Sequence, residues 1–150
     1  VDIDGYRLTM IVVHHKSGRY NDYWREAESR KIVELVHSIE AKDPARNIVV
    51  MGDFNATESA TSVLTYLEAG LRDGVARDAS DPDRAWITHA SGRRIDHILV
   101  NDAFASEIGG VSFVLGTPIL PEGVDYREAD PPEGYASDHF PVVIEFRPRD

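Results

Sequence analysis

Two early segments carry the apolar patterns of strands. Residues 7–14 alternate apolar side chains between the two sides of an extended chain, with Leu8, Met10 and Val12 on one side. Residues 48–51 form an uninterrupted apolar run that stops at Gly52. A short run of this kind predicts a strand buried on both faces, as in α/β proteins.

Two segments carry apolar residues at helical spacing. The longer one has Ile32, Leu35, Val36 and Ile39 on one side and predicts a helix that starts at Asn21 or Asp22, either of which can cap it, and ends near Ala41. Residues 59–68 predict a shorter helix, closed by Gly70. Arg25 and Glu28 fall on the inward face of the long helix. These two charged side chains either pair in a structural bridge or extend toward a site at the sheet edge.

The second half of the chain has weaker patterns. Residues 73–84 are polar and rich in turn formers. Beyond them we expect a strand pair over 86–89 and 95–100 joined through Ser91 and Gly92, a strand over 111–115, a loop with four prolines over 116–136, and a closing strand over 142–146.

Composition narrows the class of protein. A chain of 150 residues fits one domain, and its formal net charge of −10 provides no global attraction to nucleic acid or anionic membranes. The absence of cysteine excludes disulfides and thiolate metal sites and is compatible with any compartment. No stretch approaches transmembrane length. The first residues resemble neither a signal peptide nor a tail, so we expect the chain to begin inside a fold.

Polar residues recur where strands are expected to end. They are His14 and His15, Asp53 and Asn55, Asp96 and His97, and Asp138 and His139. Each pair alone has an ordinary explanation, as a solvated strand end or a turn. Four pairs in one small domain predict a site, because aspartates are hard oxygen ligands for Mg²⁺ or Mn²⁺ and histidines can transfer protons. HExxH, P-loop and GxSxG patterns are absent.

Three motifs together carry a family resemblance. "GDFNA", "RRIDHILV" and "SDHFPVVIEF", after a strand ending in "VVHHKSG", resemble the endonuclease/exonuclease/phosphatase superfamily, which is deoxyribonuclease-I-like. The resemblance implies half of a four-layer α/β/β/α sandwich, with one mostly antiparallel or mixed sheet and helices on one face. Residues 1–150 would form the carboxyl-terminal half. A metal-binding glutamate and an asparagine of the family belong to the amino-terminal half, which this sequence does not contain.

The resemblance also implies roles for individual residues. His14 and Asn55 would contact phosphate oxygens, and Asp53 would orient or deprotonate the attacking water. Asp96 would hold the catalytic histidine, His139. We predict that these two side chains form a hydrogen bond across neighbouring strands.

Further residues would complete the site. Asp138, with Asp53, would hold Mg²⁺ (or Mn²⁺), and Arg25 would bind phosphate from the helix. We interpret His15 and His97 as structural or solvent-facing. Without the family's glutamate, we expect the two aspartates to bind Mg²⁺ weakly.

The function expected from this resemblance is metal-dependent hydrolysis of a phosphate ester. The substrate would be nucleic acid, a phospholipid or a sugar phosphate, although the negative net charge of the chain weighs against tight binding of duplex DNA. The alternative is a catalytically incomplete half-domain that acts as a folding or interaction unit. In either case we expect one apolar sheet face to need a cover, either the missing half or a second copy of the chain.

Overall fold

The protein is described by a computed structural model that covers residues 1–75, 86–115, 123–125, 127–130 and 137–149. Most of the expected polar segment 73–84 and of the expected loop 116–136 lies outside the described residues.

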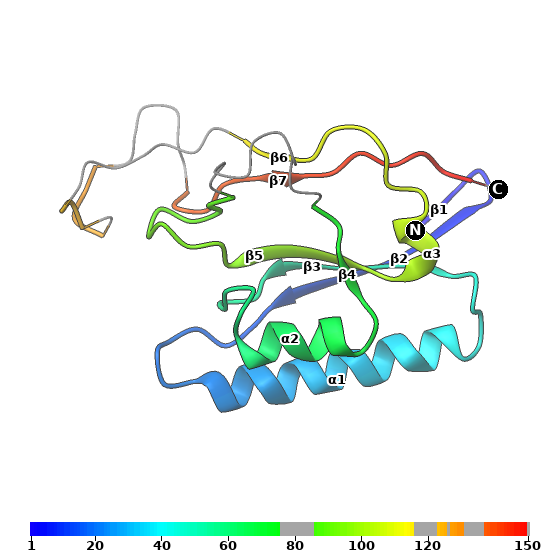
Figure 1. Ribbon diagram of the computed structural model, residues 1–150, viewed down its shortest axis with the longest axis horizontal. Helices are drawn as coiled ribbons and strands as arrows, with labels where there is room; N and C mark the ends of the chain where they lie inside the picture. Colours follow the sequence, from blue (N-terminus) through cyan, green and yellow to red (C-terminus); the bar gives the residue numbers. More distant parts are fainter. Residues whose placement is uncertain (76–85, 116–122, 126, 131–136, 150) are drawn as a thin grey trace.

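A mixed five-stranded sheet forms the centre of the described chain (Figure 1). Its spatial order is β1-β2-β3-β5-β4, and only the β2–β3 pair is parallel. The strands are β1 Asp2–Ile3, β2 Tyr6–His14, β3 Asn47–Asp53, β4 Arg72–Asp73 and β5 Asp96–Val100. The sequence therefore correctly predicted a mixed sheet and its strands β2, β3 and β5.

Two helices cover one face of this sheet. They are α1, Asp22–Glu40, and α2, Thr61–Glu68, which pack side by side (Figure 1). Ile48 and Val50 of β3 point into this layer and join Val36 of α1 and Val63 of α2 in one buried cluster. The helices thus have the positions that their apolar stripes predict.

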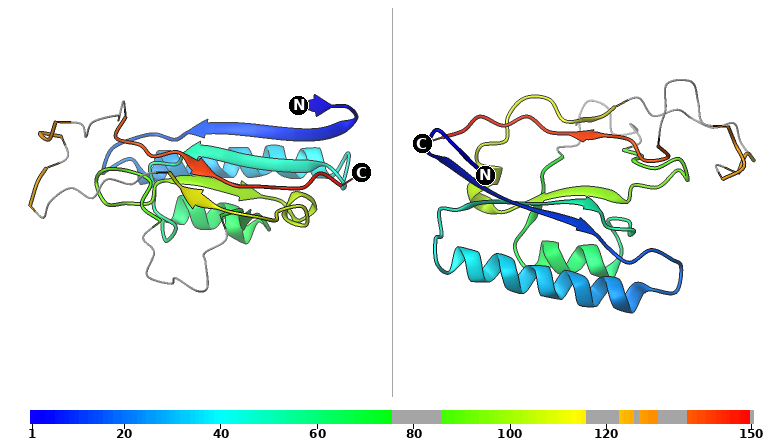
Figure 2. Two further views of the ribbon diagram at one scale, coloured as in Figure 1. Left: turned by 90° about the horizontal axis from the view of Figure 1, so that it is seen from above. Right: turned by 180° about the vertical axis from the view of Figure 1, so that it is seen from behind.

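The opposite face carries a second, smaller layer. Strands β6, Phe113–Val114, and β7, Val142–Val143, form a separate two-stranded antiparallel sheet on the side away from the helices (Figure 2). A short helix, α3, Asp102–Ala105, contributes Phe104 to the same layer. Val49 of β3 packs into the cluster that this layer shares with the sheet, so β3 is buried on both faces, as predicted.

Three strand predictions differ from the structure. Residues 86–89 form no strand, and β4 pairs with β5 in place of them. The Thr88 hydroxyl accepts hydrogen bonds from the amides of Ile95 and Asp96, both at 3.0 Å, so a side chain takes the place of strand carbonyls. The strands expected over 111–115 and 142–146 are each reduced to two residues. They pack on the main sheet and do not extend it, because Ile144 and Phe146 contact the apolar cluster beneath them.

The cover on this second face is partial. Leu8 packs against the cluster, whereas Met10 and Val12 on the same side of β2 are 43% and 72% exposed. The uncovered apolar area therefore lies over β2, and the area over β3 and β5 is covered by the chain itself. Within the described residues, no helix is long and apolar enough to cross a bilayer.

Candidate active site

Strand register brings the candidate residues into one row. His14 of β2 is the partner of Asp53 in β3, and Asp53 is in turn the partner of Asp96 in β5. Three polar residues that lie far apart in the sequence thus share one end of the sheet. This is the end at which open α/β sheets place their ligands.

The turn after β3 has a backbone that fixes Asp53. Gly52 has a φ of +135°, and a Cβ at this position would lie 2.1 Å from the carbonyl oxygen of Val13. Only glycine allows β2 and β3 to approach so closely here. The buried ring of Phe54 then anchors the turn, with its centroid 5.2 Å from the ring of His15 and 5.1 Å from that of His97.

Asn55 holds the Asp53 carboxylate in place. The Asn55 backbone amide donates to Asp53 Oδ1 at 2.7 Å, and its side-chain Nδ2 donates to Asp53 Oδ2 and to the carbonyl oxygen of His15, both at 3.0 Å. Asn55 adopts a φ of +48°, in the left-handed region that asparagine tolerates. Both hydrogens of its side-chain amide are therefore engaged within the protein.

The predicted hydrogen bond between His139 and Asp96 is present, but it does not join neighbouring strands, because Asp96 begins β5 whereas His139 precedes β7, which belongs to the smaller sheet. His139 Nδ1 lies 3.1 Å from both carboxylate oxygens of Asp96. His139 Nε2 lies 3.8 Å from Asp53 Oδ2, and His14 Nε2 lies 3.5 Å from the same oxygen. Asp53 is thus placed between two imidazoles, and one of them is oriented by a second carboxylate.

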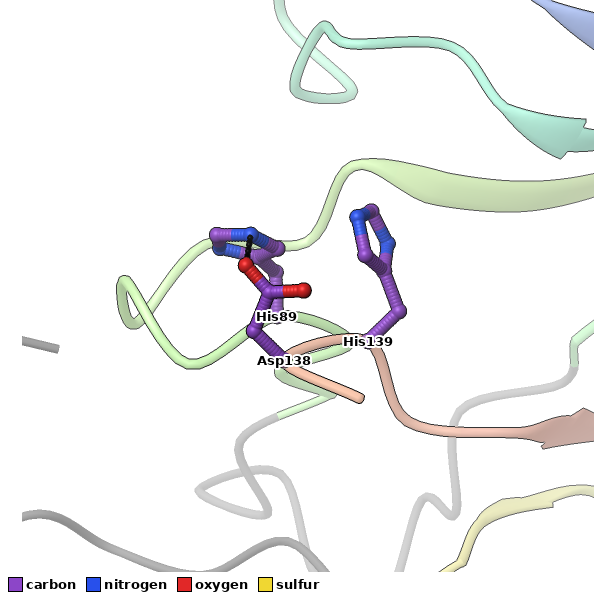
Figure 3. A group of neighbouring side chains, drawn as sticks. All are labelled: His89, Asp138 and His139. Carbon is purple, nitrogen blue, oxygen red and sulfur yellow. Dashed lines mark hydrogen bonds and ion pairs between the residues drawn. The ribbon is translucent and has the colours of Figure 1, made fainter. Parts of the chain in front are cut away.

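His89 is a member of the site that the sequence did not reveal. Its Nε2 lies 3.1 Å from Asp138 Oδ2 (Figure 3). Its Nδ1 accepts a hydrogen bond from the backbone amide of Ser91 at 3.0 Å. Its ring meets that of His139 nearly edge-on, with 4.6 Å between centroids. Burial, and then the neighbouring His139, lower the pKa of His89. The segment "WITHASG" contains no motif that marks this histidine, because its neighbours come from residues 138–139.

Arg25 and Glu28 fasten the loop that follows β2. Arg25 Nη1 donates to the carbonyl oxygens of Lys16 and Gly18 at 2.9 and 3.0 Å, and its Nη2 pairs with Asp22. Glu28 accepts from the backbone amide of Lys16 at 2.9 Å. These contacts match the structural bridge, which is one of the two interpretations of these residues. Binding of phosphate by Arg25 stays a prediction.

His15 and His97 are both buried, which matches the structural interpretation. His15 Nε2 lies 3.0 Å from the hydroxyl of Tyr66, and His97 Nε2 lies 2.9 Å from the carbonyl oxygen of Ala56. Burial is the main cause that lowers the pKa of each imidazole.

A cleft of about 730 Å³ opens beside these residues. His139, His89 and Asn55 line it, together with four arginines, Arg19, Arg25, Arg93 and Arg127. Despite the net charge of −10, the cleft carries cationic side chains suited to an anionic ligand.

Two groups of side chains could hold a metal ion. Within the described residues, Asp53, Asp96 and His139 form one group, and His89, Asp138 and His139 form the other, with ligand atoms in each group within 4.8 Å of one another. Asp53 and Asp138, the expected Mg²⁺ ligands, fall into different groups that share His139.

Comparison with known families agrees with the motifs. The sequence matches the model of the endonuclease/exonuclease/phosphatase family over residues 2–139. The chain belongs to this family. No curated protein matches the sequence.

Solved structures share the fold of this family member. The human Nocturnin catalytic domain with bound sulfate superposes with a TM-score of 0.68 and 18% identity, covering 97% of this chain and 49% of that one. A variant of the 3' phosphatase NExo from Neisseria, bound to a product DNA hairpin, gives 0.63 and 21%, covering 97% and 63%. An AP endonuclease from Archaeoglobus fulgidus gives 0.58 and 18%, also covering 97% and 63%. The chain therefore spans about half to three-fifths of the length of these proteins.

Proposed function

We propose that this chain supplies catalytic side chains for metal-dependent hydrolysis of a phosphate ester. The observation that supports this proposal most directly is the placement of Asp53 between His14 and His139, with His139 held by both oxygens of Asp96. Hydrolysis of a phosphate ester requires an aligned water and donors for the developing negative charge on the phosphoryl oxygens. A carboxylate and two imidazoles at one strand end provide both.

His139 would act as the donor to phosphate. Because Asp96 occupies Nδ1, the Nε2 atom is the one that faces the ligand, and an imidazole held by a carboxylate is fixed in both tautomer and orientation. His14, exposed at the end of β2, would contact the phosphate from the other side of Asp53.

Asp53 would orient and deprotonate the attacking water. Its carboxylate is oriented by two donors from Asn55, so its position does not depend on substrate. For Asn55 to bind a phosphate oxygen as well, one amide hydrogen would have to leave Asp53 or the His15 carbonyl. Asn55 is therefore a positioning residue before substrate binds and a phosphate ligand only after such a shift.

Asp53 and Asp138 each offer a hard carboxylate ligand, although they belong to two different groups that share His139, and we propose Mg²⁺ as the cation. A bound Mg²⁺ would stabilise the phosphoryl oxygens and the leaving alkoxide as a Lewis acid. Asp138 is half-exposed, and its contact with His89 Nε2 at 3.1 Å fixes the direction of its carboxylate. Two aspartates are few ligands for Mg²⁺, so we expect weak binding by this chain alone.

The incomplete half-domain is a second candidate. It is favoured by the length comparison, since the chain covers only 49% of the Nocturnin domain and 63% of NExo. Residues 1–150 would then be the carboxyl-terminal half of the family domain, and activity would need a partner half.

The test is hydrolysis of bis(p-nitrophenyl) phosphate with Mg²⁺ by the protein that contains this chain. We expect His139→Gln and Asp53→Asn each to lower the rate by roughly 10²–10⁴-fold. EDTA should abolish the activity, whereas His37→Gln, on the exposed side of α1, should leave it unchanged. Unchanged rates in both site variants would exclude the proposed catalysis. A folded protein without any hydrolysis would favour the half-domain.

A further inference from the structure

We propose that His89, Asp138 and His139 form a binding site for Zn²⁺ that shares Asp138 with the expected Mg²⁺ position and adds two imidazole ligands. These three side chains come together only in the fold, because residues 88–90 lie beside residues 138–140. The Ala90 amide donates to the carbonyl oxygen of Asp138, and the Phe140 amide donates to that of Thr88, both at 2.8 Å. The backbone therefore holds the three side chains together (Figure 3).

The donor set is that of a zinc site. Two imidazoles and one carboxylate offer ligand atoms within 4.8 Å of one another. Tetrahedral zinc, with bonds of about 2.0–2.1 Å, holds its ligand atoms roughly 3.4 Å apart, so these atoms must move closer together on binding. Imidazole suits Zn²⁺ far better than Mg²⁺, which prefers oxygen ligands. Small side-chain movements would bring the atoms to zinc-binding distance.

The second nitrogen of each imidazole lies beside a group that can accept a hydrogen bond. His139 Nδ1 faces the Asp96 carboxylate at 3.1 Å, and His89 Nδ1 lies 2.7 Å from Ser91 Oγ. Histidines that bind metal usually donate their other N–H to such a partner, which fixes the ring and raises the basicity of the ligating nitrogen. Nε2 is therefore the ligating nitrogen in both residues, and in His89 it now faces Asp138 Oδ2.

One local change accompanies zinc binding. In the structure His89 Nδ1 accepts from the Ser91 amide and Nε2 faces Asp138. Ligation through Nε2 requires the other neutral tautomer, in which Nδ1–H donates to Ser91 Oγ, so the proton moves within the ring and none is released. The side chains of Asp138 and His139 are 53% and 34% exposed, so an ion can reach them from solvent.

Zinc binding would affect catalysis, because His139 is also the proposed donor to the substrate phosphate. Zinc on His139 Nε2 would remove that nitrogen from the phosphate, so Zn²⁺ would inhibit Mg²⁺-dependent hydrolysis. This consequence rests on the proposed function, whereas the binding of zinc does not.

The experiment measures Zn²⁺ binding to the purified full chain, without substrate, by competition with a chromophoric chelator. Wild type should bind, and His89→Gln should weaken the affinity by roughly tenfold or more, as loss of a ligand requires. Glutamine can still donate to Asp138, so this variant separates ligation of zinc from orientation of the carboxylate. His37→Gln is the matched control and should bind as wild type does.

Two further measurements cover the case in which His89→Gln does not fold. Asp138→Asn changes a half-exposed residue and should also weaken binding by roughly tenfold. In wild type, Zn²⁺ should shift the imidazole NMR signals of His89 and His139 and leave those of His15 and His97 in place. Wild-type affinity in Asp138→Asn or a folded His89→Gln, or unshifted His89 and His139 signals, would overturn the proposal. If the wild-type protein binds zinc as expected but hydrolyses no phosphate ester, the proposed function is refuted and the zinc site is not.

Discussion

At the scale of single residues, the geometry of the site depends on two positions in the turn after β3. Gly52 lets β3 approach β2, and Asn55 orients the Asp53 carboxylate. Both residues decide where the Asp53 oxygens lie before substrate binds. The "GDFNA" motif therefore fixes the position of the Asp53 carboxylate in addition to supplying it.

Gly52→Ala should destabilise the protein more than an ordinary glycine substitution. The new Cβ would collide with the Val13 carbonyl oxygen at 2.1 Å and would also strain a φ of +135°. Strained backbone alone costs about 1–3 kcal/mol, and the collision adds to it. We expect a loss in unfolding free energy of at least about 3 kcal/mol, measured by urea denaturation.

Gly70→Ala is the matched control for this substitution. Its φ is +96°, but within the described residues no heavy atom lies within 4 Å of the added Cβ. Gly70→Ala should lower the unfolding free energy by about 1–2 kcal/mol, which is the cost of placing a side chain in the left-handed backbone region. Equal losses in the two variants would show that the contact with Val13 does not limit the approach of the strands.

At the scale of elements, the sequence correctly predicted those helices and strands whose apolar residues follow a local periodicity. Strands β2 and β3 and helices α1 and α2 follow from apolar spacing over eight or more residues or from an uninterrupted run. The sequence predicted strands β6 and β7 but made them too long, and it wrongly predicted a strand over 86–89, since the conformation of these segments depends on contacts with distant parts of the chain. His89 was missed for the same reason. The pairing of Asp96 with His139 came from the family resemblance and not from spacing.

Thr88 links the irregular segment 86–89 to the start of β5. Its hydroxyl, fully buried, accepts from the amides of Ile95 and Asp96. Thr88→Val keeps the shape but leaves both donors unpaired, at a cost of about 1–3 kcal/mol each. We expect a lower midpoint in urea denaturation and a displaced Asp96.

Thr88→Ser retains the acceptor and is the control for Thr88→Val. It should keep both amide hydrogen bonds and lose only the packing of one methyl group. Slow hydrogen exchange at the Asp96 amide in Thr88→Ser, and fast exchange in Thr88→Val, would verify the link. Equal protection in both variants would contradict it.

At the scale of the whole molecule, buried imidazoles make stability depend on pH. Burial lowers the pKa of His15 and of His97 below the ordinary value of 6.5. The unfolded chain therefore binds more protons than the folded chain just below this pH, so stability falls as the pH decreases from about 6.5. We expect a lower thermal midpoint at pH 5.5 than at pH 7.5.

His97→Gln tests this origin of acid sensitivity. Glutamine retains a donor for the Ala56 carbonyl oxygen but does not titrate. The difference in thermal midpoint between the two pH values should become smaller in this variant and remain unchanged in His37→Gln, whose side chain is exposed. An unchanged difference in His97→Gln would assign the acid sensitivity to other groups.

The uncovered part of β2 should control association of the molecule. Met10 and Val12 are exposed on the face that the smaller sheet leaves open, and beyond Arg7 the described residues contain no strand that pairs with the outer side of β2. An open edge with apolar side chains favours pairing with another chain, and lysine at such an edge opposes it. We expect light scattering to give a mass above the 16.7 kDa of one chain, unless a partner polypeptide covers the face.

Val12→Lys should shift the mass toward the monomer, because a charge on the open face would have to be buried in the contact. Glu34→Lys on the exposed side of α1 makes a control of the same final residue and should leave the mass unchanged. A wild-type monomer at high concentration, with no partner present, would show that the partial cover by β6 and β7 is sufficient.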